Sequence, residues 1–368
     1  MLHTIWFLLI AVLWIGYFFL EGFDFGSGIL LPFLGKTHAE KRAIYNAVGP
    51  VWDGNEVWVL TAGGAIFAAF PQWYASLFSG FYLALFVILL ALIVRICAFE
   101  YRSKIDSDTW RKTWDGLLVF GSVVPALLWG VAFGNIVMGV PLETVNGVQH
   151  VFTGTFFTLL RPFPLLAGLT TLLVFTLHGA IFLSLKTAGD LAERARKLAW
   201  PLGIATVVVG AAFILVAQFW LLGGIDKYFI GFALTAVLLI VAVVLSKLKR
   251  PGWSFISMGL TIAVFTGTLF WALYPNVLPS TISPATNSLT IDNAASSDYT
   301  LTLMTWVACI MVPIVLIYMS WTYWVFRKRV DPSTLTGPTG LPPSFLSNKA
   351  NPPAAPSAPS TPTPEGAR

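Results

Sequence analysis

Nine long apolar stretches constrain the fold of this chain more than any other feature of its sequence. A membrane-spanning helix needs roughly 20 mostly apolar residues, and nine segments meet that requirement. These segments are about 5–26, 51–70, 74–98, 116–139, 162–185, 199–222, 228–246, 253–274 and 301–326. Only 11% of the residues are charged, whereas a soluble domain carries about 25%. The sequence therefore predicts an all-α polytopic membrane protein with nine transmembrane helices.

Basic residues alternate between the connections and predict the orientation of the helices. The odd-numbered connections and the end of the last helix are rich in Lys and Arg, whereas the even-numbered ones contain only Arg161 and Lys227. Because positively charged loops stay in the cytoplasm, we expect the N-terminus outside and the C-terminus in the cytoplasm. The net charge of +5 then reports topology, and we expect no nucleic-acid partner.

The composition divides the chain into two parts. Residues 1–330 are predicted to form the membrane domain. Residues 331–368 are rich in Pro, Ala, Ser and Thr and are predicted to be a disordered cytoplasmic tail, because such a segment cannot bury a core. The first apolar run lacks a basic leader and a small-residue cleavage site, so we interpret it as a retained helix.

Acidic residues gather at the predicted cytoplasmic ends of the first two spans. Asp53 and Glu56 are three residues apart and share one face of a helix. Acidic side chains are costly to keep at a membrane span and often mark proton routes. The candidate proton-pathway residues are Asp53, Asp24, Glu56 and Glu21, with Trp52, Asn55, Arg95 and Glu100 in supporting roles.

Each of these charges also has a purely structural interpretation. Asp53 lies near a helix N-terminus, where it would complement the helix dipole. Arg95 could snorkel to lipid headgroups, and Glu100 could pair with Arg102. The convergence of four acids from two helices nevertheless favours a proton entry path.

Residues that bind metals or haem are scarce. Only His178 among the four histidines lies inside a predicted span, and a haem needs one or two axial ligands. We interpret His178 as a packing residue, so this chain would not hold two or three haems alone. Cys97 and Cys309 both lie in apolar segments, which indicates neither a disulfide framework nor a thiol metal site.

Several motifs resemble subunit II of cytochrome bd-type quinol oxidases. They occur in order along residues 5–326. The motifs are Gly-Phe-Asp-Phe-Gly at 22–26, Trp-Asp-Gly-Asn-Glu-Val-Trp at 52–58, Thr-Ala-Gly-Gly-Ala at 61–65, Phe-Glu-Tyr-Arg-Ser-Lys at 99–104, Val-Ala-Phe-Gly-Asn at 131–135 and Met-Thr-Trp-Val-Ala at 304–308.

The resemblance implies an architecture and an assembly. The expected fold has two four-helix bundles plus one peripheral helix. The chain would pair with a haem-bearing subunit I as a heterodimer in the bacterial plasma membrane, with small single-helix subunits as further partners. Subunit I would carry haem b, haem d and the quinol-oxidising loop, and some members of the family hold a structural quinone in subunit II.

The resemblance also implies a function. The complex would oxidise ubiquinol or menaquinol, reduce dioxygen to water and generate proton motive force without a pump. No catalytic residue is expected in this subunit. Protons would enter from the cytoplasm partly through Asp53, the acid of the Trp-Asp-Gly-Asn motif. Two alternatives stay open: a purely structural partner without a proton role, and a secondary transporter, which is less favoured because the acids lie at the membrane edge rather than the midplane.

Overall fold

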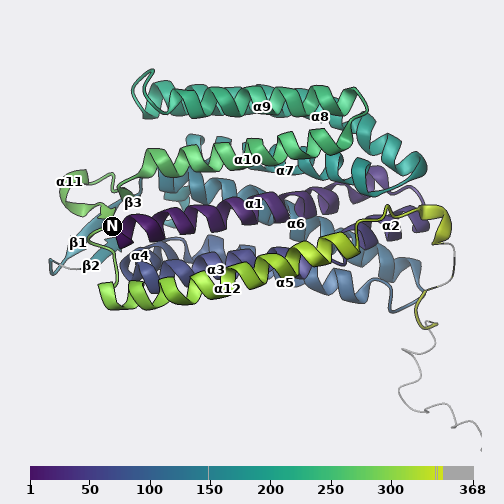
Figure 1. Ribbon diagram of the computed structural model, residues 1–368, viewed down its shortest axis with the longest axis horizontal. Coiled ribbons are helices and arrows are strands. Elements are labelled where there is room, and N and C mark those ends of the chain that lie inside the picture. Colours follow the sequence, from purple (N-terminus) through teal and green to yellow (C-terminus); the bar gives the residue numbers. More distant parts are fainter. Residues whose placement is uncertain (148, 336, 338, 343–368) are drawn as a thin grey trace, which may run out of the picture.

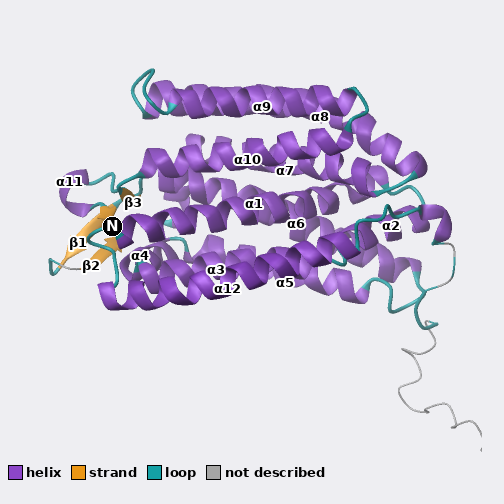
Figure 2. Cartoon of the chain, in the orientation of Figure 1, coloured by secondary structure: helices purple, strands orange, loops and turns teal. Residues whose placement is uncertain are grey.

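The computed structural model describes residues 1–147, 149–335, 337 and 339–342. Long helices run side by side along the longest axis of the molecule (Figure 1), and short strands occur at one end only (Figure 2). The helices are α1 (Leu2–Leu34), α2 (His38–Val48), α3 (Trp52–Ala69), α4 (Pro71–Gly80), α5 (Tyr82–Tyr101), α6 (Asp108–Met138), α7 (Pro162–Lys186), α8 (Gly189–Leu215), α9 (Phe229–Lys247), α10 (Pro251–Leu273), α11 (Pro284–Asn287) and α12 (Asp298–Val325). A π-helical turn, Val216–Leu221, extends α8.

Eight helices of the described chain are long and apolar enough to cross a membrane. The segment predicted at 51–70 is helix α3, but the polar residues of its first turns keep it out of that group. The count of nine therefore stays a prediction. The segment predicted as one span at 74–98 is divided at Phe81 into α4 and α5.

Several helices extend beyond the apolar segments that predicted them. Helix α6 begins at Asp108, eight residues before its predicted span, because Ser107 accepts a hydrogen bond from the backbone N–H of Trp110. Helix α8 begins at Gly189, ten residues before its predicted span. Hydropathy marks the part of a helix that lipid surrounds, whereas the helix itself can begin earlier in a polar segment, at the Ser107 cap in α6 and without a side-chain cap in α8.

Helix α1 lies at the centre of the packing. It contacts α3, α6, α7 and α10, and 20 of its residues are buried. Helices α7, α8, α9 and α10 pack against each other in sequence order. Helix α12 is peripheral, since Leu301 is its one buried residue among those described. The grouping into two four-helix bundles stays a prediction.

Two glycines permit the closest approach between α1 and α7. A Cβ atom on Gly26 would overlap the carbonyl oxygen of Phe175 and lie 2.7 Å from the backbone nitrogen of Gly179. A Cβ atom on Gly22 would lie 2.8 Å from the Phe175 ring. The Gly-x-x-x-Gly spacing at 22–26 therefore lets two backbones touch, and this contact fixes α1, which carries two candidate acids.

The two ends of the molecule differ in character. The connections α1–α3, α5–α6, α7–α8 and α9–α10 share one end with the last turn of α12 (Figure 1). We call this end, which carries the Lys- and Arg-rich connections, the basic end. The opposite end has two antiparallel strand pairs, β1 (Leu142–Val145) with β2 (Gln149–Phe152) and β3 (Asn276–Leu278) with β4 (Leu289–Thr290). The prediction of an all-α chain thus holds for the membrane helices, while these connections add short strands.

The segment after α12 runs across the basic end. Pro332–Thr334 form a 3-10 turn, and Arg42 of α2 donates hydrogen bonds of 2.8 and 2.9 Å to the carbonyl oxygens of Leu335 and Gly337. Leu341 exchanges backbone hydrogen bonds with the α5–α6 connection. The expected tail from residue 331 thus begins with an ordered, bonded stretch; its larger part, 343–368, lies outside the described residues.

Candidate functional site

A buried ion pair forms the centre of the candidate site. Arg95 of α5 donates from Nη1 to Oε2 of Glu21 on α1 across 2.6 Å. Both residues have 0% of their surface exposed. Helix α6 packs closely behind Arg95, because a Cβ atom on Gly121 would lie 2.6 Å from the Arg95 Cβ. The two charges are thus held between α1 and α6, away from solvent.

Asp24 joins the same cluster through a hydrogen-bonded chain. Its Oδ2 accepts a 2.8 Å hydrogen bond from Nδ2 of Asn55 on α3 and lies 3.9 Å from Nη2 of Arg95. The Oδ1 atom of Asn55 accepts a 2.6 Å hydrogen bond from the hydroxyl of Tyr323 on α12. Asp24 and Asn55 are buried, so the chain links the peripheral α12 to the interior.

Glu56 completes a set of three carboxyl groups around one guanidinium. Its Oε2 lies 3.9 Å from Nη1 of Arg95. Several buried atoms of this set have no hydrogen-bond partner among the described residues, namely Glu21 Oε1, Asp24 Oδ1, Glu56 Oε2 and Arg95 Nε and Nη2. Unsatisfied buried polar atoms are rare and often mark functional sites. Three acids around one arginine give the cluster capacity to hold and exchange protons.

Aromatic rings enclose the arginine. The Arg95 guanidinium lies 4.7 Å from the centre of the Phe25 ring and 5.7 Å from that of Phe99. Trp52 stacks on Phe99 with an interplanar angle of 4°. These contacts stabilise the cation and exclude water, so Trp52 and Arg95 both lie where supporting residues were expected.

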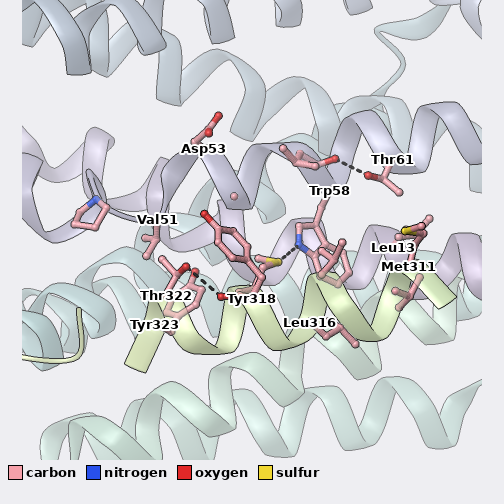
Figure 3. Close-up of a pocket in the computed structure, with 16 residues that line it drawn as sticks. Leu13, Val51, Asp53, Trp58, Thr61, Met311, Leu316, Tyr318, Thr322 and Tyr323 are labelled. Carbon is pink, nitrogen blue, oxygen red and sulfur yellow. Dashed lines mark hydrogen bonds between the residues drawn. The ribbon is translucent and has the colours of Figure 1, made fainter. Parts of the chain in front are cut away.

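Asp53 does not join the cluster. It is exposed and lines a groove of about 400 Å³ between α3 and α12. Its carboxylate points away from α12 (Figure 3), and it lies in the first turn of α3, where a negative charge complements the helix dipole. The prediction that four acids converge is therefore correct for Glu21, Asp24 and Glu56, while Asp53 lies outside.

Two contacts join α3 to α12 beside the groove. Trp58 donates from Nε1 to the sulfur of Met319 at 3.2 Å (Figure 3), and the Tyr323 hydroxyl donates to Oδ1 of Asn55. Tyr323 was not found from the sequence, because it lies 268 positions from Asn55 in a span with no acidic motif nearby.

A second polar cluster, also missed, lies at the basic end. Asp115 of α6 accepts from Nε of Arg102 at 2.5 Å and from Nζ of Lys41 at 2.9 Å. The Tyr45 hydroxyl lies 3.3 Å from Asp115 Oδ1, and burial together with this carboxylate raises the pKa of Tyr45 well above its usual range. The alternative interpretation that Glu100 pairs with Arg102 is wrong: Glu100 is exposed, and Arg102 pairs with Asp115.

His178 is enclosed by aromatic rings. Its Nε2 donates to the carbonyl oxygen of Phe19 across 3.0 Å, and its ring stacks on Phe255 at 4.9 Å. These contacts pack the ring against α1 and α10, and the interpretation of His178 as a packing residue stays a prediction.

The comparison with known proteins decides the family. A family model described as cytochrome bd terminal oxidase subunit II matches residues 2–326. The chain belongs to this family. The subunit II family assignment covers both the buried cluster and the groove, and it makes the chain part of a terminal oxidase in the bacterial plasma membrane, as the motifs predicted.

Two relatives of this subunit II chain are similar over nearly their whole lengths. Cytochrome bd ubiquinol oxidase subunit 2 of Bacillus subtilis is 40% identical over 339 residues, which cover 90% of this chain and 97% of the relative. Cytochrome bd-I ubiquinol oxidase subunit 2 of Escherichia coli is 38% identical, with 89% and 95% covered. A chain of the bd oxidase structure from Geobacillus thermodenitrificans superposes with a TM-score of 0.68 at 16% identity, covering 89% of this chain and 99% of the other, which shows a shared fold.

Proposed function

We propose that this chain is subunit II of a quinol oxidase that oxidises ubiquinol or menaquinol and reduces dioxygen to water. In this proposal it stabilises a haem-bearing subunit I and supplies a proton entry path from the cytoplasm. The observation that carries the proton role is the set of three carboxyl groups around Arg95, two buried on α1 and one half-buried on α3. A subunit with only a packing role has no need for two buried acids, since burial costs several kcal/mol per charge.

The proposed path starts at the basic end and reaches the cluster. Asp53 is exposed at the groove and would receive protons from the cytoplasm, and Glu56 lies one turn further along α3. Glu56 and Glu21 both approach Nη1 of Arg95, at 3.9 and 2.6 Å. A proton that neutralises one acid changes the electrostatic interaction of the shared guanidinium with the other acids. This coupling favours transfer of the proton to the next acid.

Haem does not fit the residues of this chain. The Nε2 atom of His178 is already bonded to a backbone carbonyl, and its ring is packed between aromatic side chains. We therefore assign haem b and haem d to subunit I and derive no step through them here. A structural quinone would find its apolar surroundings in the cavity of about 170 Å³ lined by Phe18, Phe175 and residues of α8 to α10.

The topology belongs to the same proposal. Helix α3 runs in line with its neighbours from the basic end to the opposite end (Figure 1), which supports it as the ninth span. The Lys- and Arg-rich connections support a cytoplasmic location for the basic end. The secondary-transporter alternative has no support from the family, whereas a purely structural role remains the competing hypothesis.

Substitution of single carboxyl groups separates the proton role from the structural one. Asp53→Asn, Glu56→Gln and Asp24→Asn should each slow quinol-dependent oxygen uptake by the purified complex, while its haem content stays normal. The control is Asp108→Asn, which removes an exposed acid from the same end. Unchanged turnover in all three variants would contradict the proton role, and a parallel loss of haem would support the purely structural hypothesis.

A further inference from the structure

A cavity of about 330 Å³ lies at the basic end, outside the carboxylate cluster. It is formed where α7 and α12 end, where α10 begins and where α2 leads into α3. Three helices that cross the membrane thus reach its surface at this cavity. A ligand held there would have one part at the level of the lipid headgroups and another part against the apolar helices.

The lining divides into a charged rim and an apolar wall. The rim holds Lys186, Arg327 and Arg329, and no acidic residue is among the described lining residues. The wall is formed mainly by Phe182 and Phe255, which lie deeper along α7 and α10. This arrangement, with cations at the membrane surface and rings toward its interior, matches an anionic amphiphile.

The three cations differ in how far the protein already satisfies them. Lys186 donates to the carbonyl oxygen of Phe326, and Arg327 donates to that of Trp324 at 2.6 Å. Arg329 is exposed and forms no ion pair or hydrogen bond with a described residue. The adjacent acid, Asp331, accepts from the N–H and hydroxyl of Ser333. The rim therefore carries excess positive charge that the chain itself does not neutralise.

We propose that this cavity binds one anionic phospholipid. Its phosphate would bind at Lys186, Arg327 and Arg329, since charge-assisted hydrogen bonds from Arg to phosphate are among the strongest available. Its acyl chains would pack on Phe182 and Phe255 and continue along the exposed apolar faces of α10 and α12, where Ile256 and Ile317 are 51% and 71% exposed. The lipid would join α12, which buries little surface of its own, to α7 and α10.

Native mass spectrometry of the assembled oxidase tests this proposal independently of turnover. The complex is released from nanodiscs that contain equal amounts of phosphatidylglycerol and phosphatidylcholine. We expect phosphatidylglycerol to be retained selectively, and Arg329→Gln to weaken its retention by about tenfold, which corresponds to one charge-assisted contact. Arg329 bonds to no described residue, so this variant leaves the contacts within the fold intact.

The matched control is Lys112→Gln, which removes an exposed cation from the same end but lines no part of the cavity. It should retain phosphatidylglycerol like the wild type. Equal retention of both lipids, or equal retention by Arg329→Gln and Lys112→Gln, would overturn the proposal. Glycerol phosphate without acyl chains should compete poorly, and competition at the affinity of the lipid would show a phosphate site instead.

Discussion

The buried pair of Arg95 and Glu21 allows a quantitative test of the carboxylate cluster. Arg95→Met would leave three carboxyl groups without their cation, and two of them, Glu21 and Asp24, are at most 1% exposed. Removing one partner of a buried ion pair costs about 3–5 kcal/mol, because the other charge is left uncompensated. We therefore expect a loss of this size in the free energy of unfolding.

A double variant distinguishes the loss of a compensating charge from the loss of side-chain packing. Glu21→Gln in the Arg95→Met background removes the charge left unpaired, so part of the lost stability should return. The coupling between the two sites should be about 2 kcal/mol, within the range found for residues in direct contact. Asp24 retains its hydrogen bond from Asn55 but still lacks the cation, so recovery should be incomplete.

The assay is unfolding of the purified complex in mixed micelles of increasing denaturing-detergent content, followed by tryptophan fluorescence. Arg111→Met serves as the control, because its carboxylate partners are 46% and 87% exposed and such pairs contribute below about 1 kcal/mol. Additive losses in the double variant would refute the reasoning, since they would mean that Arg95 does not compensate Glu21.

Three further outcomes follow from contacts elsewhere in the chain. Gly26→Val should prevent assembly of the membrane domain, measured as yield of the complex, because its side chain would overlap the backbone of Phe175; normal yield would contradict the close approach of α1 and α7. Glu40→Gln should lower stability by about 1 kcal/mol at pH 7. Burial raises the Glu40 pKa, but hydrogen bonds from Arg194 and two backbone N–H groups outweigh it and hold the pKa below its ordinary value. The contribution of ionised Glu40 to stability is thus fully present above that ordinary value and is lost as pH falls through the folded pKa. The wild-type and variant unfolding curves should therefore converge in acid. Asp115→Asn should destabilise the complex by about 2–4 kcal/mol in the same detergent assay, because it leaves two cations without their acid, and an unchanged midpoint would count against this cluster.

The sequence predicted the membrane helices and their shared ends well, because both depend on local properties. Apolar runs predicted eight helices that meet the length and hydropathy of a span, and the alternation of basic residues predicted which connections lie together. The break at Phe81 was not predicted, since α4 and α5 form one continuous apolar run. The early starts of α6 and α8 were missed because both lie in polar segments outside the apolar runs, and α6 alone begins at a side-chain cap.

The candidate site was predicted in composition but not in arrangement. The placement of charged residues at the cytoplasmic ends of the predicted spans indicated Glu21, Asp24, Glu56 and Arg95, and all four meet in the structure. Asp53 was ranked first among the acids, yet it is exposed and forms no ion pair with Arg95, and Tyr323 was absent from the prediction. Both differences depend on which way a helix face is turned and on which other helix packs against that face.

The sequence by itself determined the class of this protein, its apolar segments, the basic character of one end and its family. Each of these is a property of residues near one another in the chain or of motifs in a fixed order. The tertiary structure alone decided that three acids share Arg95, that Tyr323 reaches Asn55 across 268 positions and that Asp115 is paired at the basic end. Whether a charge is buried, paired or exposed depends on which helices pack around it, and that packing joins residues that are far apart in sequence.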